Sequence, residues 1–219
     1  MSKATKNGAA VVDVEAETRT DKAREDRFVH ERPYCADVVI IGTAHMLHHR
    51  YDCEQVKIQS EGGKGTKTKK TDNVESYLYR VPGTGEVGVA AVCIKAALLE
   101  AGKSFQDPRS PRKSARDLLK ASVFVTPEVP SLGKKTWDFL HQAGACVQRN
   151  RITRVRPGFT EGWRLEFTIN VIQPSLVPAA FLQKLVTHAG QFCGLGDWRP
   201  DYGRFRIESF KTRDTVEAR

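Results

Sequence analysis

The stretch PAAFLQKLVTHAGQFCGLGDWRPDYGRFRI, residues 178–207, joins an apolar-striped segment to a glycine-rich loop and the start of a strand. Residues 178–193 predict an amphipathic helix, and Pro178 suits its first position. Its predicted buried stripe consists of Phe181, Leu182, Leu185, Val186, Ala189 and Phe192. Residues 204–210 alternate as a strand, so the order is helix, loop, strand.

The segment before this helix also alternates between apolar and polar residues. Leu165, Phe167, Ile169 and Val171 share one face of a predicted strand at 163–172. Residues 146–155 alternate as well, and the turn signals at 157–162 predict that the two strands form a hairpin. Strand, helix, loop and strand then make one half of a ferredoxin-like sheet.

The first half of the chain is expected to complete that sheet. A β-branched run at 37–41 predicts a buried strand, residues 77–81 a short strand, and residues 89–101 a helix. A short helix at 114–120 and an apolar strand at 121–125 follow. The predicted fold class is α+β, an RRM-like antiparallel sheet with two main helices, a glycine-rich loop before the last strand, and inserted hairpins and loops.

Composition divides the chain into a single domain and flexible segments. Residues 1–32 are polar, with seven basic and seven acidic side chains, and predict a disordered tail. The domain is expected to span 33–213, interrupted by a flexible lysine-rich loop at 60–73 and followed by a short tail at 214–219. Of 35 basic and 26 acidic residues, 28 and 19 lie after residue 32, so the domain carries the whole net charge of +9. That excess favours a polyanionic partner.

The five cysteines and the hydropathy indicate where the protein functions. An odd number of cysteines without CxxC spacing points to a reducing cytoplasm. No apolar run reaches the length of a membrane span, so we expect no membrane partner.

The glycine-rich loop contains the strongest binding signal. Its glycines allow unusual backbone geometry, its arginines supply charge, and its aromatic rings can stack on bases. The candidate nucleic-acid contacts in the loop are Gly194, Gly196, Trp198, Arg199, Tyr202 and Arg204. We expect the loop amides to approach the sugar-phosphate chain closely.

Other basic residues extend this predicted surface. The strand of residues 149–156 places four arginines in eight residues, which indicates either a phosphate-contacting face or a solvated one. The additional candidates are His49, Arg50, Lys67, Lys69, Lys70, Arg149, Arg151, Arg154 and Arg156.

One cluster, His45, His48, His49 and Cys53, has ligand-type side chains. No second ligand pair lies near it, so we predict no metal site. The Gly194-Leu195-Gly196 sequence follows a helix and precedes a strand, the reverse of a dinucleotide-binding context, and no cofactor is expected. As an alternative, one of the three histidines could act as general base in metal-independent RNA cleavage.

The helix, glycine loop and strand of 178–207 resemble the RAMP superfamily, the CRISPR-associated RRM-like proteins whose backbone subunits coat guide RNA. The matching residues are Gly194, Gly196, Gly203, Arg204 and Phe205. Four blocks, 39–51, 87–101, 149–159 and 194–207, resemble uncharacterised phage and archaeal proteins of that type. The resemblance implies a subunit that coats a strand as a homo-oligomer. The thumb-like insertions familiar from CRISPR backbone subunits are short in this sequence. This favours a phage-encoded single-strand binder in the host cytoplasm over a guide-RNA complex.

The leading hypothesis is therefore a non-catalytic protein that coats single-stranded RNA or DNA. Arginine and aromatic contacts serve both nucleic acids. The alternatives are the histidine-dependent endoribonuclease and an assembly subunit whose basic face meets an acidic protein partner.

Overall fold

The computed structural model describes residues 32–51, 73–147 and 150–214. Almost all of the predicted tail at 1–32, the loop at 60–73 with Lys67, Lys69 and Lys70, and the tail at 214–219 lie outside the described residues, as do Cys53 and Arg149. The side chain of Arg151 is also outside the description.

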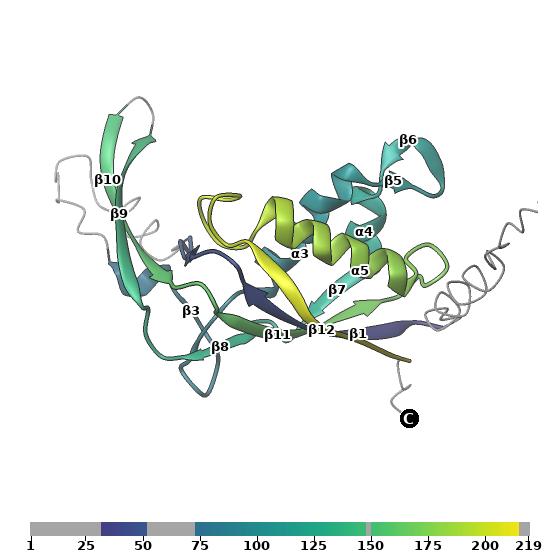
Figure 1. Cartoon of the computed structure of the whole chain (residues 1–219), viewed down its shortest axis with the longest axis horizontal. Helices are drawn as coiled ribbons and strands as arrows, with labels where there is room; N and C mark the ends of the chain where they lie inside the picture. Colours follow the sequence, from purple (N-terminus) through teal and green to yellow (C-terminus); the bar gives the residue numbers. More distant parts are fainter. Residues whose placement is uncertain (1–31, 52–72, 148–149, 215–219) are drawn as a thin grey trace, which may run out of the picture.

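The central element is a four-stranded antiparallel sheet (Figure 1). Its order is β12 (Phe205–Asp214), β1 (Tyr34–Gly42), β11 (Arg164–Val171) and β7 (Val123–Thr126). Val38 pairs with Phe167 of β11 on one side and with Phe210 of β12 on the other. The predicted strands at 37–41, 163–172 and 204–210 are thus confirmed, with β1 at the centre of the sheet.

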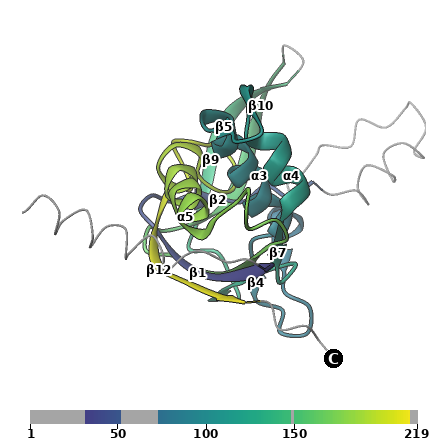
Figure 2. The same cartoon turned by 90° about the vertical axis from the view of Figure 1, so that its right-hand side faces the viewer.

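Helices cover one face of this sheet (Figures 1 and 2). They are α3 (Ala91–Ala101), α4 (Arg116–Ser122) and α5 (Ala179–His188). Alternate residues of β1 and β11, such as Ile40 and Ile169, are fully buried beneath the helices, and Leu182 of α5 is fully buried as well. The chain runs β1, α3, α4, β7 and then β11, α5, β12, and the strands of the two units interleave. No helix among the described residues is long and apolar enough to span a membrane.

The predicted hairpin of 146–155 with 163–172 is wrong. Strand β10 (Asn150–Phe159) pairs instead with β9 (Phe139–Val147), and Pro157 and Gly158 lie inside β10. The β9–β10 hairpin projects away from the main sheet (Figure 1). Alternation identifies a strand but leaves its partner open, because a period of two carries no information on which strand lies alongside. Gly158 fits here because a Cβ would lie 2.4 Å from the ring of Phe139.

The short strand predicted at 77–81 does not belong to the main sheet either. A 3-10 turn, η2 (Val74–Tyr77), precedes β3 (Tyr79–Arg80), which joins β4 (Val87–Gly88) and β8 (Ser131–Lys134) in a small separate sheet. The second strand of the first unit is β7, which lies beside β11. The two-residue strand β2 (Met46–Leu47) pairs antiparallel with the end of β10 and completes a three-stranded sheet with β9.

A second hairpin lies at the opposite end of the molecule from β9–β10 (Figure 1). It follows the short turn η3 (Gly102–Ser104) and consists of β5 (Gln106–Asp107) and β6 (Ser110–Ser114).

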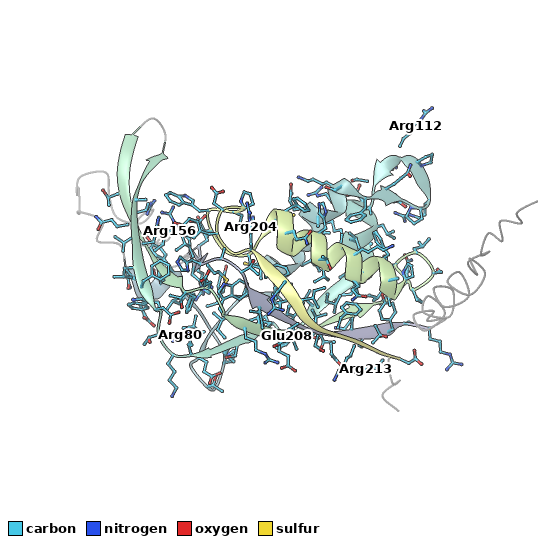
Figure 3. All side chains as sticks on the ribbon, in the orientation of Figure 1. Arg80, Arg112, Arg156, Arg204, Glu208 and Arg213 are labelled. Atoms are coloured by element: carbon cyan, nitrogen blue, oxygen red, sulfur yellow. The ribbon has the colours of Figure 1, made fainter. Side chains whose placement is uncertain are left out.

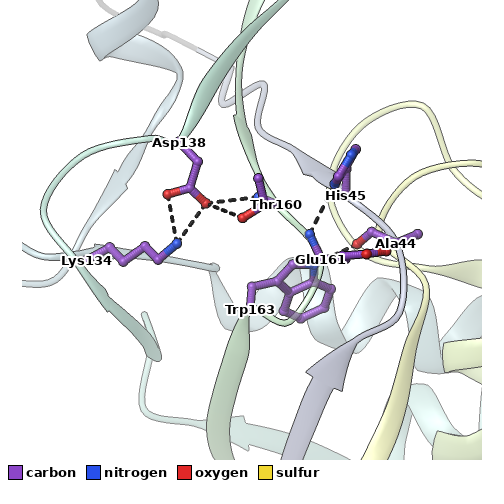
Figure 4. A network of polar contacts seen from close by, with 7 residues as sticks. All are labelled: Ala44, His45, Lys134, Asp138, Thr160, Glu161 and Trp163. Carbon is purple, nitrogen blue, oxygen red and sulfur yellow. Dashed lines mark hydrogen bonds and ion pairs between the residues drawn. The ribbon is translucent and has the colours of Figure 1, made fainter.

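Polar contacts fix the base of the β9–β10 hairpin (Figure 4). The Asp138 carboxylate accepts hydrogen bonds from Lys134 Nζ at 2.7 Å, Thr160 N at 2.9 Å and Thr160 Oγ1 at 3.0 Å. Trp163 Nε1 donates to the Ala44 carbonyl at 2.9 Å. The hairpin is therefore tied to β8 on one side and to the end of β1 on the other.

Candidate nucleic-acid interface

The glycine-rich loop closes on itself and on the segment that follows β1. Leu195 N donates to the Gly203 carbonyl at 2.9 Å, and Gly203 N donates to the His45 carbonyl at 2.7 Å. Asp197 N donates to the Leu47 carbonyl at 2.8 Å. These bonds place the loop against β2 and next to the base of the β9–β10 hairpin.

The loop glycines are required by the packing of the protein itself. Gly194, Gly196 and Gly203 have φ values of +71°, +81° and +76°, which favour glycine. A Cβ on Gly203 would lie 1.8 Å from the Leu195 oxygen, and one on Gly196 would lie 2.3 Å from the Leu47 oxygen. The side on which a Cβ would stand is thus filled by the chain's own backbone, so the fold alone explains these glycines.

Phe192 is not part of the buried stripe, contrary to the sequence prediction. The α-helix ends at His188, and a π-helical turn over Ala189–Cys193 follows, with Gly194 N bonded to the Ala189 carbonyl at 2.8 Å. The wider turn changes the direction in which side chains leave the axis. As a result the Phe192 side chain is 62% exposed.

Trp198 is held in a strained conformation at the tip of the loop. Its φ of +55° makes it the single non-glycine residue with positive φ in the described part of the chain. The Arg156 guanidinium lies 5.0 Å from its ring centroid, and the His141 ring lies 4.9 Å away edge-on. Trp198 remains 38% exposed, so part of its indole is accessible to solvent despite these contacts.

Arg156 supports the loop from within the protein. It is 6% exposed, and its Nε donates to Asp197 Oδ2 at 2.5 Å. The predicted role of Arg156 in phosphate contact is therefore wrong: its guanidinium lies under Trp198 and is neutralised by a loop carboxylate. Asp197 and His141 were missed by the sequence analysis, since only the folded register places His141 opposite Arg156.

The other predicted loop residues lie around this support. Arg199 and Arg204 are exposed, and Arg204 Nε donates to the Pro200 carbonyl at 2.8 Å. The Tyr202 hydroxyl lies 3.3 Å from His141 Nε2, and its ring lies 6.1 Å from that of Trp198. Figure 3 shows Arg204 beside the loop and Arg156 near the hairpin base. The structure thus groups two exposed arginines with two aromatic rings.

His49, Arg50 and Arg154 meet a different set of rings. His49 packs on Tyr77 with centroids 4.5 Å apart, and the Arg50 guanidinium lies 5.8 Å from the Tyr79 centroid. Arg154, which is half-buried, places Nη1 3.5 Å from the Tyr77 hydroxyl. These predicted residues line the outer side of the hairpin base, next to η2.

The three histidines of the predicted cluster have separate environments. His45 Nδ1 accepts a hydrogen bond from Glu161 N at 3.1 Å, which places the ring proton of the neutral form on Nε2 (Figure 4). His48 is 3% exposed and packs against Phe159, with centroids 4.9 Å apart. Neither arrangement presents a free basic nitrogen to a substrate. Within the described residues, no group of three or more His, Cys, Asp or Glu side chains could hold a metal ion.

Burial of His48 makes stability depend on pH. Desolvation lowers the pKa of His48 from 6.5 to about 4, and neither ring nitrogen has a hydrogen-bond partner among the described residues. Because the unfolded chain takes up a proton on this residue near pH 6.5 and the folded protein does not, stability should fall by about 3 kcal/mol between pH 6.5 and pH 4. Urea unfolding of His48→Leu should show this loss removed, whereas the exposed control His49→Leu should keep it. An equal pH slope in both variants would contradict the assignment.

On the sheet face that the helices do not cover, two arginines are already paired with carboxylates of the protein. Arg164 Nε lies 2.8 Å from Glu208 Oε2, and Arg213 Nε lies 2.8 Å from Asp37 Oδ2. The labelled Glu208 and Arg213 lie on the side away from the helices in Figure 3. An approaching polyanion would meet these carboxylates as well as the arginines. The loop beside the helices is therefore the better candidate surface.

Comparison with known proteins supplies a structural likeness but no sequence match. No protein-family model matches the chain, and no curated protein matches its sequence. The fold is similar to that of a chain in the cryo-EM structure of the Type III-B Cmr-beta bound to cognate target RNA, with a TM-score of 0.52. The two chains are 12% identical, and the match covers 93% of this chain and 68% of that one. The protein thus has an α+β fold that is similar to the fold of one chain in that structure.

Proposed function

We propose that the protein binds single-stranded nucleic acid, most favourably RNA, without cleaving it, as a distant relative of the RAMP superfamily. The strand order β12-β1-β11-β7 supports this, because it is the order of a ferredoxin-like sheet with β1 first, β7 second, β11 third and β12 fourth. The glycine loop between α5 and β12 lies at the position that the RAMP resemblance implies. The fold shared with a chain of an RNA-bound structure supports the same function.

The observation that carries the proposal is the half-exposed Trp198 beside two exposed arginines. Its indole packs against Arg156 and His141 and is still 38% exposed. Arg199 and Arg204 can reach phosphates on either side of a stacked base. Base stacking and phosphate contact together give binding that tolerates any sequence and weakens with salt.

The coating of a strand by several copies is part of this proposal. A chain that covers a strand should form larger species in the presence of the strand and stay small without it. Light-scattering mass measurements with and without oligonucleotide test this point. Large species in the absence of nucleic acid would favour the assembly subunit with a protein partner instead.

A salt titration tests the binding itself. Labelled single-stranded RNA and DNA of equal length should bind with an affinity that falls steeply as salt rises. Arg199→Ala should reduce the slope of log affinity against log salt by about 0.7, the value for one phosphate contact on a single strand. Arg213→Ala, which removes an equal charge from the open sheet face, serves as the control and should leave the slope unchanged. Binding that ignores salt would overturn the proposal.

A further inference from the structure

Beside the loop lies a hollow of about 520 Å³, within the rough 300–1,000 Å³ range of ligand-sized sites. It lies between the end of α3, the π turn after α5 and the glycine loop. Its lining includes Glu100, Phe192, Gly196, Trp198, Arg199 and Pro200. Asp197 also lines it and is already paired with Arg156, so two aromatic rings, two carboxylates and one arginine surround the same space.

The two rings are fixed before any ligand arrives. Phe192 packs against His188 with ring centroids 4.6 Å apart, and His188 packs against Phe105 at 5.3 Å. Trp198 is held from the other side by Arg156 and His141. Because these rings already occupy defined positions, a stacking partner would lose little affinity to their ordering.

The charges of the hollow distinguish a base from a phosphate. Glu100 and Asp197 both place a carboxylate along the hollow and would disfavour a phosphate there. Asp197 is paired with Arg156, whereas Glu100, which pairs with Lys103 at 2.7 Å, can also accept a hydrogen bond from an amino group. Arg199 lines the same hollow and would attract the phosphate attached to such a base. The preferred occupant is then a flat, uncharged ring with an exocyclic amine.

We infer that this hollow binds one unstacked nucleobase bearing an exocyclic amino group, with Phe192 and Trp198 as stacking surfaces and Glu100 as hydrogen-bond acceptor. The inference rests on the proposed function and goes beyond it by assigning a base site that includes Phe192 and Glu100. The π turn has a role in this site, because it brings Phe192 out of the core and beside the loop.

The stacking role is tested with Phe192→Ala against labelled oligocytidine. Loss of one stacking surface should weaken binding about tenfold, while the salt slope stays that of the wild type because no phosphate contact is lost. Phe124→Ala is the matched control, since Phe124 is also exposed, at 47%, but lies on β7 at the edge of the sheet. The control should bind like the wild type.

The acceptor role is tested with oligocytidine and oligouridine of equal length, which differ in the amino group. Wild-type protein should prefer oligocytidine several-fold, and Glu100→Ala should lose that preference. Glu166→Ala removes an equal charge from the exposed face of β11 and should retain it.

Each outcome separates the two proposals. Salt-dependent binding of the wild type with unchanged affinity in Phe192→Ala would overturn the base site and leave the proposed function standing. A change of oligomeric state in Phe192→Ala without loss of affinity would assign the hollow to a contact between copies. No binding of any strand by the wild type would remove both proposals.

Discussion

Replacement of Asp197 by alanine is expected to lower the free energy of unfolding by about 3 kcal/mol, because it leaves a buried arginine charge unpaired. Arg156 is 6% exposed, and the Asp197 carboxylate is its ion-pair partner. One further nitrogen, Nη1, is already buried without a hydrogen-bond acceptor in the described part of the chain. Without the carboxylate, the guanidinium would keep its contact with the face of Trp198 but lose its ion-pair partner.

Urea unfolding measures this loss, and two further variants define its cause. Asp201→Ala removes an exposed carboxylate from the same loop and should change stability by less than about 0.5 kcal/mol. In an Arg156→Met background the removal of Asp197 should cost much less, because no buried charge is left behind. If Asp197→Ala were as stable as Asp201→Ala, the ion pair would contribute nothing measurable to the free energy of unfolding.

The same substitution should also weaken binding of single strands. Arg156 is the platform on which Trp198 rests, and a displaced guanidinium would release the indole from its strained conformation. The expected loss of affinity should come without the reduced salt slope that marks a lost phosphate contact. The ion pair between Arg156 and Asp197 is thus expected to support both the stability of the fold and the binding of single strands.

Those parts of the fold that depend on local periodicity could be predicted from the sequence. Strand β11 alternates strictly, and β1 contains a β-branched run, so both elements follow from the residues they bury. The α5 segment and β12 follow in the same way. Since β11, α5 and β12 are consecutive, their arrangement could be inferred as one unit.

Pairings between distant segments were not available to such reasoning. Strands β10 and β11 both alternate, and nothing in either pattern says that β10 pairs with β9 and β11 with β1. The exposure of Phe192 depends on a π turn, for which its apolar neighbours give no signal. Gly190 in this turn lies against β12, where a Cβ would be 2.3 Å from the Phe205 oxygen, and only the folded structure shows that contact.

The sequence predicts a candidate site in the loop, and the structure gives several of its residues surroundings that differ from those expected. An arginine in a strand predicts surface charge, whereas Arg156 is buried against a carboxylate 41 residues away. The loop glycines predict close approach of the backbone to a ligand, whereas a Cβ on Gly196 or Gly203 would collide with the protein's own backbone. Residue type predicted the chemistry of the loop, and only tertiary contacts determined which side each group faces.

Replacement of Gly203 by alanine is the sharper test of that distinction. The new Cβ would lie 1.8 Å from the Leu195 oxygen, in a residue whose φ is +76°. The left-handed conformation alone costs roughly 1–2 kcal/mol for a side chain, and the backbone clash should bring the total to about 3–4 kcal/mol. Two loop hydrogen bonds, from Leu195 N and to the His45 carbonyl, would be strained together.

Gly162→Ala is the matched control for this variant. Gly162 has a φ of +87°, yet nothing lies within 4 Å of its Cβ position, so it reports the conformational cost without the clash. Urea unfolding should therefore show Gly162→Ala destabilised by roughly 1–2 kcal/mol and Gly203→Ala by about 2 kcal/mol more. Equal losses would mean that the loop yields easily and that its glycines are not set by packing. The proposal expects a larger loss of stability for Gly203→Ala than for Gly162→Ala. It also expects weaker binding of single-stranded nucleic acid by Gly203→Ala at temperatures where this variant stays folded. Both results together would establish that the rigid loop presents Trp198 and Arg199 to a ligand.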